Sequence, residues 1–224
     1  MNHGDYVLGL LKNHQATGRT ILLIRHSARD LLRITPDGLH EDVAITPEGI
    51  VHAEEFGRKL QTIVPDTTLH LGYTAPRRCR MTAESIRKGH SSLNGTRDLG
   101  ILPCVESVIT DPDRFRVLWD EKGWHSLMQE WLGGAIPGDT IRDPHDYSDR
   151  LLRALVSMPG GGDGALVVAV AHDVTILPIV ASVCGTTLTT IGFLNGVLIS
   201  GDSTGAKIRF ADPEHSLCRE WCPE

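Results

Sequence analysis

Apolar residues run almost without interruption through two short stretches of the chain. These stretches are RTILLI, residues 19–24, and GALVVAVA, residues 164–171, and both are rich in β-branched residues. Continuous apolar runs of this length are typical of strands that are covered on both faces. The pattern therefore predicts two buried strands in the middle of a sheet.

Between and after these runs, apolar positions recur every three or four residues, which is the spacing of amphipathic helices. The clearest helix is predicted over residues 45–64, where Thr46 suits the N-cap and Pro47 the first helical position. Further helices are predicted over 76–89, within 113–134, over 145–158 and from 174 onwards. Strands that alternate with helices predict an α/β fold, with three α/β/α layers and a mostly parallel sheet.

Length and composition fit one globular domain. The chain has 224 residues, of which 41% are hydrophobic and 22% charged, and its formal net charge is −6. An acidic chain is a poor general binder of nucleic acid, and no apolar run approaches the length of a membrane span. The N-terminal segment lacks the pattern of a signal peptide. We expect a single domain over residues 1–224, in the cytoplasm, with neither nucleic acid nor a membrane as its partner.

Five scattered cysteines also favour a reducing, cytoplasmic setting, because a chain of this size folds without disulfides. Near the C-terminus, His215, Cys218 and Cys222 have spacings that bring side chains together on one helical face. Three ligands without an identifiable fourth are more typical of ordinary thiols than of a metal site. We therefore expect no metal and no cofactor.

Two histidines follow directly after the two predicted strands. His26 stands between Arg25 and Arg29, and His172 precedes Asp173. Ligands of open α/β sheets bind at the carboxyl ends of the strands. A single histidine at such a position is weak support for a site, but two histidines with these neighbours predict one.

A third basic group lies where the strand-like residues 69–73 pass into the helix predicted over 76–89. It contains Arg77, Arg78 and Arg80. Only some of these side chains can point toward one site from a helix, and spacing alone does not select among them.

These segments together resemble the histidine phosphatase superfamily, whose phosphoglycerate mutase-like fold includes acid phosphatases and cofactor-dependent mutases. The resemblance rests on ordered blocks between about residues 21 and 177, namely LIRHSARD, ITPEGIVHAEEFGRKL, APRRCRMTAESI and VAHDVTILP. It implies a metal-independent phosphatase that hydrolyses phosphomonoesters through a phosphohistidine intermediate. In this comparison Arg78 falls on the pocket arginine of the family.

The resemblance also implies a role for each residue at the strand ends. His26 is the implied nucleophile, and His172 is the implied donor to a phosphate oxygen. Arg25, Arg29 and Arg78 are the implied phosphate ligands, and the planar arginine fork matches phosphate oxygens better than lysine does. His26 must be unprotonated to attack phosphorus, and neighbouring arginines disfavour its cationic form.

Protonation of the leaving group requires an acid. Asp173 resembles the proton donor of the acid-phosphatase branch, in which the His-Asp pair occurs. Asp111 and Glu106 are alternatives, because other members of the superfamily take this acid from a separate loop. Asp173 also suits the N-cap of the following helix, which is a purely structural role.

Two positions depart from the family pattern. Ser27 stands where the family most often has glycine, and Asp30 stands where the acid-phosphatase type of block has proline. The Ser-x-Trp-Asn continuation of similar mutases is missing, which weighs against a glycolytic mutase. The alternative functions are a mutase-type phosphotransferase and a non-catalytic phosphate-binding module. A metal-dependent phosphohydrolase built on His172 and Asp173 would need further metal ligands.

The substrate is the least determined part of the prediction. A small-molecule phosphomonoester is the expected partner, and the segments expected to cover its pocket are residues 31–44 and 101–143. The second segment contains Trp119, Trp124 and Trp131. Helix packing is the favoured role of these rings, and a substrate-binding wall is the alternative. The oligomeric state is left open.

Overall fold

The computed structural model describes residues 3–14, 18–30, 42–91, 95–158, 164–186 and 188–223. Within them the chain forms six helices and seven strands. The strands are β1 (Arg19–Arg25), β2 (Leu69–Tyr73), β3 (Thr96–Ile101), β4 (Leu166–Ala171), β5 (Gly196–Asp202), β6 (Gly205–Ala211) and β7 (Ser216–Trp221). The helices are α1 (Asp5–Lys12), α2 (Pro47–Ile63), α3 (Arg77–Gly89), α4 (Pro112–Leu132), α5 (Pro144–Val156) and α6 (Asp173–Cys184).

The seven strands form one sheet in the order β3-β2-β4-β1-β5-β6-β7. The strands β3, β2, β4 and β1 pair in parallel, whereas β5, β6 and β7 extend the sheet from β1 in antiparallel pairs. The expectation of a mostly parallel sheet is therefore correct for only half of it. The segments between β5 and β6 and between β6 and β7 are a few residues long. Connections this short join antiparallel strands, because a parallel crossover needs about a dozen residues or more.

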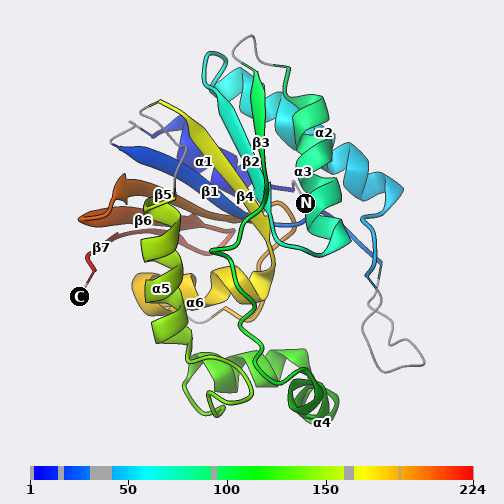
Figure 1. The fold of residues 1–224 in the computed structure, drawn as a ribbon, viewed down its shortest axis with the longest axis vertical. Helices are drawn as coiled ribbons and strands as arrows, with labels where there is room; N and C mark the ends of the chain where they lie inside the picture. Colours follow the sequence, from blue (N-terminus) through cyan, green and yellow to red (C-terminus); the bar gives the residue numbers. More distant parts are fainter. Residues whose placement is uncertain are drawn as a thin grey trace.

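Helices cover both faces of the sheet, which confirms the three-layer prediction (Figure 1). On the central strand β1, Leu22 and Ile24 pack in one apolar cluster with α1, α2 and α3. Ile21 and Leu23 pack in a second cluster with α5 and α6. Successive side chains of a strand point to opposite faces, so this alternation buries β1 on both sides. In Figure 1, α4 lies apart from the sheet, below α5 and α6.

The helices predicted from the apolar spacing are present. Thr46 caps α2 as expected, and its Oγ1 accepts a hydrogen bond from the amide of Gly49 at 3.0 Å. The helix α4 is interrupted at Gly123, whose φ of 72° lies in the left-handed region that favours glycine. No helix in the described part of the chain is long and apolar enough to span a membrane.

The C-terminal segment forms a strand, and the helical spacing considered for it is wrong. Residues 216–221 pair with β6 as β7, with Cys218 opposite Arg209. Because a strand rises about 3.3 Å per residue, residues three and four apart lie farther from each other than on a helix, so His215, Cys218 and Cys222 do not gather. Among the described residues, no group of three or more His, Cys, Asp or Glu side chains could hold a metal ion.

Candidate active site

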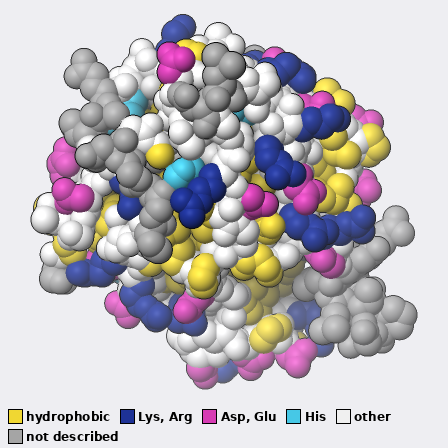
Figure 2. Space-filling view, turned by 45° about the horizontal axis from the view of Figure 1, so that its top comes forward, with side chains coloured by type: hydrophobic (Ala, Val, Ile, Leu, Met, Phe, Trp, Pro, Cys, Tyr) yellow, Lys and Arg dark blue, Asp and Glu magenta, His cyan; other side chains and the backbone are white. Residues whose placement is uncertain are grey.

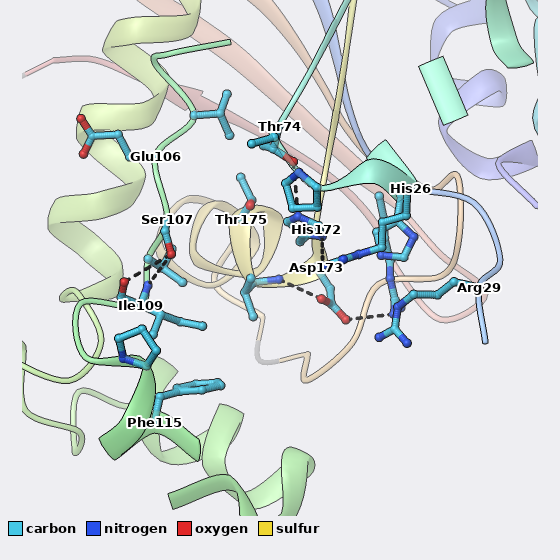
Figure 3. Close-up of a pocket in the computed structure, with 18 of the residues that line it drawn as sticks. His26, Arg29, Thr74, Glu106, Ser107, Ile109, Phe115, His172, Asp173 and Thr175 are labelled. Carbon is cyan, nitrogen blue, oxygen red and sulfur yellow. Dashed lines mark hydrogen bonds and ion pairs between the residues drawn. The ribbon is translucent and has the colours of Figure 1, made fainter. Parts of the chain in front are cut away.

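The carboxyl ends of β1 and β4 bring two histidines together. These strands pair in parallel with Arg25 opposite Ala171, so the residues that follow them start at the same edge of the sheet. The ring centroids of His26 and His172 lie 5.4 Å apart, and the rings are inclined at 68°. Figure 3 shows both histidines on one side of a pocket.

The ring of His26 is 2% exposed and is held in one tautomer. Its Nδ1 lies 2.8 Å from the carbonyl oxygen of Ser27. Because a carbonyl oxygen only accepts hydrogen bonds, Nδ1 carries the proton and Nε2 keeps its lone pair. Burial, and then the nearby His172, lower the pKa of His26 to about 2. His26 is therefore a neutral imidazole at neutral pH, with Nε2 unprotonated.

The loop that follows β1 is clamped by polar contacts from α2 and α3. The Ser27 hydroxyl donates to the carbonyl oxygen of Gly49 at 2.7 Å, and the Ser27 amide donates to Thr82 Oγ1 at 3.0 Å. A Cβ atom on Gly49 would lie 2.3 Å from the carbonyl oxygen of Ala28, so this close approach requires glycine. Leu194 is the only described non-glycine residue with a positive φ. Ser27 therefore has a negative φ, so serine can replace the family's glycine at this position without backbone strain.

His172 occupies the N-cap position of α6. Its Nδ1 lies 3.5 Å from Arg78 Nη2, and its Nε2 lies 3.3 Å from Thr74 Oγ1. Burial, and then the charge of Arg78, lower the pKa of His172 to about 3. Both imidazoles are therefore neutral at neutral pH, and the positive charge of the site comes from its arginines.

Arg25, Arg29 and Arg78 line the same pocket as the two histidines. Burial lowers the pKa of all three guanidinium groups. The Nε atom of each arginine is buried and has no hydrogen-bond partner among the described residues. Half-buried guanidinium groups with unused N–H donors favour the binding of an anion with several oxygens.

Arg25 is fixed in position by several groups. Its Nη1 donates to Thr190 Oγ1 at 3.2 Å and to the carbonyl oxygen of Ile191. Its Nη2 lies 3.3 Å from Asp173 Oδ2, and the guanidinium carbon lies 4.5 Å from the centre of the Phe193 ring. Such contacts preorganise the guanidinium before any ligand arrives.

The structure separates the three arginines at the start of α3. Arg78 lines the pocket, whereas Arg77 and Arg80 do not and are exposed. Arg80 forms an ion pair with Glu84 at 3.8 Å, one helical turn further on. The arginine that faces the histidines is therefore the one that the family comparison selected.

Asp173 lies beside the arginines as the first residue of α6, and it is 8% exposed. Its Oδ1 accepts a hydrogen bond from the amide of Val174 at 3.1 Å, while Oδ2 contacts Arg25. The N-cap of α6 is His172, so the N-cap role considered for Asp173 is wrong. The carboxylate is left facing the basic part of the pocket.

The other candidate acids have different surroundings. The side chain of Asp111 caps α4 and is not among the residues that line the pocket. Glu106 lines the pocket, but its carboxylate lies 3.0 Å from Arg142 Nη2 and points away from the histidines (Figure 3). Asp42, which carries no signal in the sequence pattern, also lines the pocket, and its Oδ1 accepts the first amide of α3 at 2.8 Å.

The pocket has a volume of about 660 Å³ and two unlike sides. One side, which we name the phosphate side after the ligand expected from the sequence, consists of His26, His172, Arg25, Arg29 and Arg78. The apolar side consists of Val105, Val108, Ile109, Pro112, Phe115, Trp119 and Trp124. Figure 3 shows the two sides facing each other, and Figure 2 shows one face of the molecule where a histidine lies beside Lys or Arg side chains, with apolar side chains nearby.

The tryptophans of α4 divide between the core and the pocket. Trp131 is fully buried, as helix packing predicts. Trp119 and Trp124 lie on either side of the interruption at Gly123, and their ring centroids are 5.1 Å apart. They pack against each other and also line the pocket. For these two rings the predicted role in helix packing is therefore only part of what the structure shows.

The structure describes only part of the two segments that were expected to cover the pocket. Residues 101–143 contribute the whole apolar side. Of the segment 31–44, residues 31–41 lie outside the described residues, and Asp42 lines the pocket.

Several residues of the site were not predicted. Thr74 contacts His172 and comes directly after β2, so the argument applied to the other strand ends would have found it. Phe193, which lies under Arg25, precedes β5 in a loop and has no chemical signal in the sequence. A metal-dependent phosphohydrolase would need further ligands around His172 and Asp173, and no such group exists among the described residues.

The fold and the pair of histidines among three arginines define the class of the protein: a three-layer α/β protein with a basic pocket at the carboxyl ends of its parallel strands. A profile of the histidine phosphatase superfamily (branch 1) matches residues 21–196, and the chain belongs to this superfamily. No curated protein matches the chain significantly by sequence.

Solved structures with a similar fold include YhfR of Bacillus stearothermophilus, which is 20% identical, has a TM-score of 0.57 and aligns over 83% of this chain and 92% of its own. A mycobacterial glucosyl-3-phosphoglycerate phosphatase is 16% identical, has a TM-score of 0.54 and aligns over 92% of this chain and 98% of its own. A mutant phosphoserine phosphatase of Entamoeba histolytica, solved with phosphoserine, is 16% identical, has a TM-score of 0.51 and aligns over 89% of this chain and 94% of its own. At these identities the likeness establishes the fold alone.

Proposed function

We propose that the protein hydrolyses phosphomonoesters, with His26 as the nucleophile and a phosphohistidine as the intermediate. One observation carries the proposal: a neutral imidazole with an unprotonated Nε2 stands among three half-buried arginines, whose buried Nε donors have no partner in the described part of the chain. Phosphoryl transfer needs a nucleophile and positive donors around the remaining oxygens of phosphorus. Two of the proteins with a similar fold are phosphatases by name, which agrees with hydrolysis.

In the first step, Nε2 of His26 attacks phosphorus, so that an N–P bond forms as the P–O bond to the alcohol breaks. The guanidinium groups donate to the non-bridging oxygens, over which the negative charge is spread in the transition state. His172 donates to one of these oxygens. The hydrogen bond from Nδ1 to the Ser27 carbonyl keeps the ring oriented while it takes up positive charge.

Asp173 is the proposed acid and base. In the first step Asp173, which must be protonated when the substrate is bound, gives its proton to the leaving oxygen, so that the alcohol departs neutral. In the second step its carboxylate accepts a proton from water, whose oxygen attacks phosphorus as the N–P bond breaks. The products are an alcohol and inorganic phosphate, and both side chains return to their starting states. Its contact with Arg25 at 3.3 Å supports this role, because the acid must stand beside the bound phosphate.

Rapid quenching with a radiolabelled phosphomonoester, in the presence of EDTA, tests the proposal. We expect an acid-labile, base-stable label in the native protein and none in His26→Ala. The control His90→Ala removes another buried histidine, which does not line the pocket, and should keep the label.

The native protein should also release inorganic phosphate from p-nitrophenyl phosphate in EDTA. Turnover by His26→Ala without any covalent label would refute the mechanism. Transfer of the phosphoryl group to a second alcohol without release of phosphate would indicate a phosphotransferase. A complete loss of activity in EDTA alone would indicate a metal-dependent enzyme.

A further inference from the structure

The apolar side of the pocket faces the position of the leaving group. If the phosphoryl group binds to the phosphate side, the alcohol part of the substrate extends across the pocket toward Phe115, Trp119 and Trp124. Phe115 and Trp119 meet edge to face, with ring centroids 6.0 Å apart, and Trp119 in turn packs on Trp124. These rings form a continuous aromatic surface of the kind that binds apolar or aromatic groups.

Several polar side chains next to this surface already have partners within the protein. Ser107 Oγ donates to the carbonyl oxygen of Ile109 and accepts its amide, at 3.3 and 3.1 Å. Thr190 Oγ1 is bonded to Arg25, and Trp124 Nε1 donates to the carbonyl oxygen of Thr189 at 2.8 Å. Ser107 and Trp124 therefore have little hydrogen-bonding capacity left for the hydroxyl groups of a sugar or of glycerol.

Charge on this side of the pocket also disfavours an anionic leaving group. Among the described residues that line the pocket, the only Lys or Arg side chains are Arg25, Arg29 and Arg78, and all three belong to the phosphate side. A second carboxylate on the substrate would find no further cation there and would lose its hydration on entry.

We infer that the preferred substrate is a phosphomonoester of a bulky, uncharged apolar alcohol, such as an aromatic one. This inference rests on the proposed function, since it assumes that the phosphoryl group binds among the three arginines. A pocket of about 660 Å³ lies within the range of sites for drug-sized ligands, so it has room for a ring system beside the phosphoryl group.

Three alkyl phosphates test the inference: 2-phenylethyl phosphate, ethyl phosphate and 3-phosphoglycerate. All three are esters of primary alcohols, so differences in kcat/KM report mainly how the alcohol part is bound. Burial of roughly 100 Å² of ring surface is worth a factor of about 50. We therefore expect kcat/KM for 2-phenylethyl phosphate to exceed that for ethyl phosphate roughly 50-fold, and that for 3-phosphoglycerate by more.

Variants of α4 assign the preference to the aromatic surface. Trp119→Ala should lower the ratio of kcat/KM between 2-phenylethyl and ethyl phosphate about 10-fold, whereas Trp119→Phe, which keeps an aromatic ring, should retain most of it. The control Val117→Ala changes a residue of the same helix that is 49% exposed and outside the pocket, and it should leave the ratio as in the native protein.

The results separate this inference from the proposed function. If p-nitrophenyl phosphate and the three alkyl phosphates are all left intact, the proposed function fails and the inference fails with it. If they are hydrolysed but 3-phosphoglycerate is used as well as 2-phenylethyl phosphate, only the inference is overturned. A ratio that is the same in Trp119→Ala and in the native protein would also overturn it.

Discussion

Replacement of Asp173 by asparagine removes one ionisable proton from the active site and nearly keeps the shape of the side chain. Asparagine can still accept the amide of Val174 through its carbonyl oxygen, but its amide cannot pair with Arg25 as the carboxylate oxygen does at 3.3 Å. Arg25 keeps its contacts with Thr190, Ile191 and Phe193. We therefore expect the variant to fold, with a free energy of unfolding lower by about 1–3 kcal/mol.

The effect on catalysis should depend on the leaving group. General acid catalysis contributes about 10²–10⁴-fold to such reactions, so kcat/KM for an alkyl phosphate should fall at least ~100-fold in Asp173→Asn. p-Nitrophenolate is already stable as an anion, so formation of the phosphohistidine from p-nitrophenyl phosphate should slow by less than about 10-fold. Attack of water on the intermediate still needs a base, and the phosphoenzyme should therefore accumulate.

Stopped-flow absorbance and steady-state assays measure both effects. For Asp173→Asn with p-nitrophenyl phosphate we expect a burst of about one nitrophenolate per active site, followed by slow turnover. Glu106→Gln is the matched control, because its carboxylate is paired with Arg142 and should not take part. The assignment is refuted if Asp173→Asn affects both substrates equally. If Asp42→Asn instead shows the dependence on the leaving group, Asp42 is the acid.

Three further outcomes are expected. Arg78→Ala should lower kcat/KM by about 10²–10³-fold, the scale of losing one preorganised donor, whereas the exposed Arg80→Ala should change it little. Because burial lowers the pKa of His26 to about 2, the unfolded state binds the extra proton below about pH 6.5, so stability falls as the pH drops. The loss between pH 6 and pH 4 in urea unfolding should be smaller in His26→Ala by roughly 2–3 kcal/mol. Gly49→Ala, whose Cβ would lie 2.3 Å from the carbonyl oxygen of Ala28, should destabilise the protein by about 1–3 kcal/mol and lower kcat, as measured by urea unfolding and initial rates.

The parts of the fold that follow from local pattern could be predicted. The buried strands β1 and β4 were recognisable from continuous apolar runs, and α2 was recognisable from its cap and its apolar spacing. The antiparallel half of the sheet was missed, because the sequence argument rested on two central strands. Residues 216–221, which form β7, were considered as part of a helix. The spacing of His215, Cys218 and Cys222 gave no information on pairing with a neighbouring strand.

The site could be predicted where topology alone places residues together. The residues after β1 and β4 had to meet, because parallel neighbours end at the same edge of the sheet. The choice of Arg78 over Arg77 and Arg80 came from the family resemblance and not from spacing. Phe193 and the pocket face of Trp119 depend on how loops and α4 pack, and no residue pattern in those segments encodes that packing.

The apolar side of the pocket comes from one uninterrupted stretch of chain, residues 105–124, whereas the phosphate side comes from the end of β1, the residues after β1 and β4, and the start of α3. Because of this separation, residues 105–124 can be treated as one exchangeable segment, here called the cassette, in redesign. Exchange of the cassette between relatives should alter which alcohols are accepted and leave the arginines and histidines untouched. Such a graft should keep the bridge between Ile109 and Ile141, because this backbone pairing ties the exchanged stretch to the segment before α5.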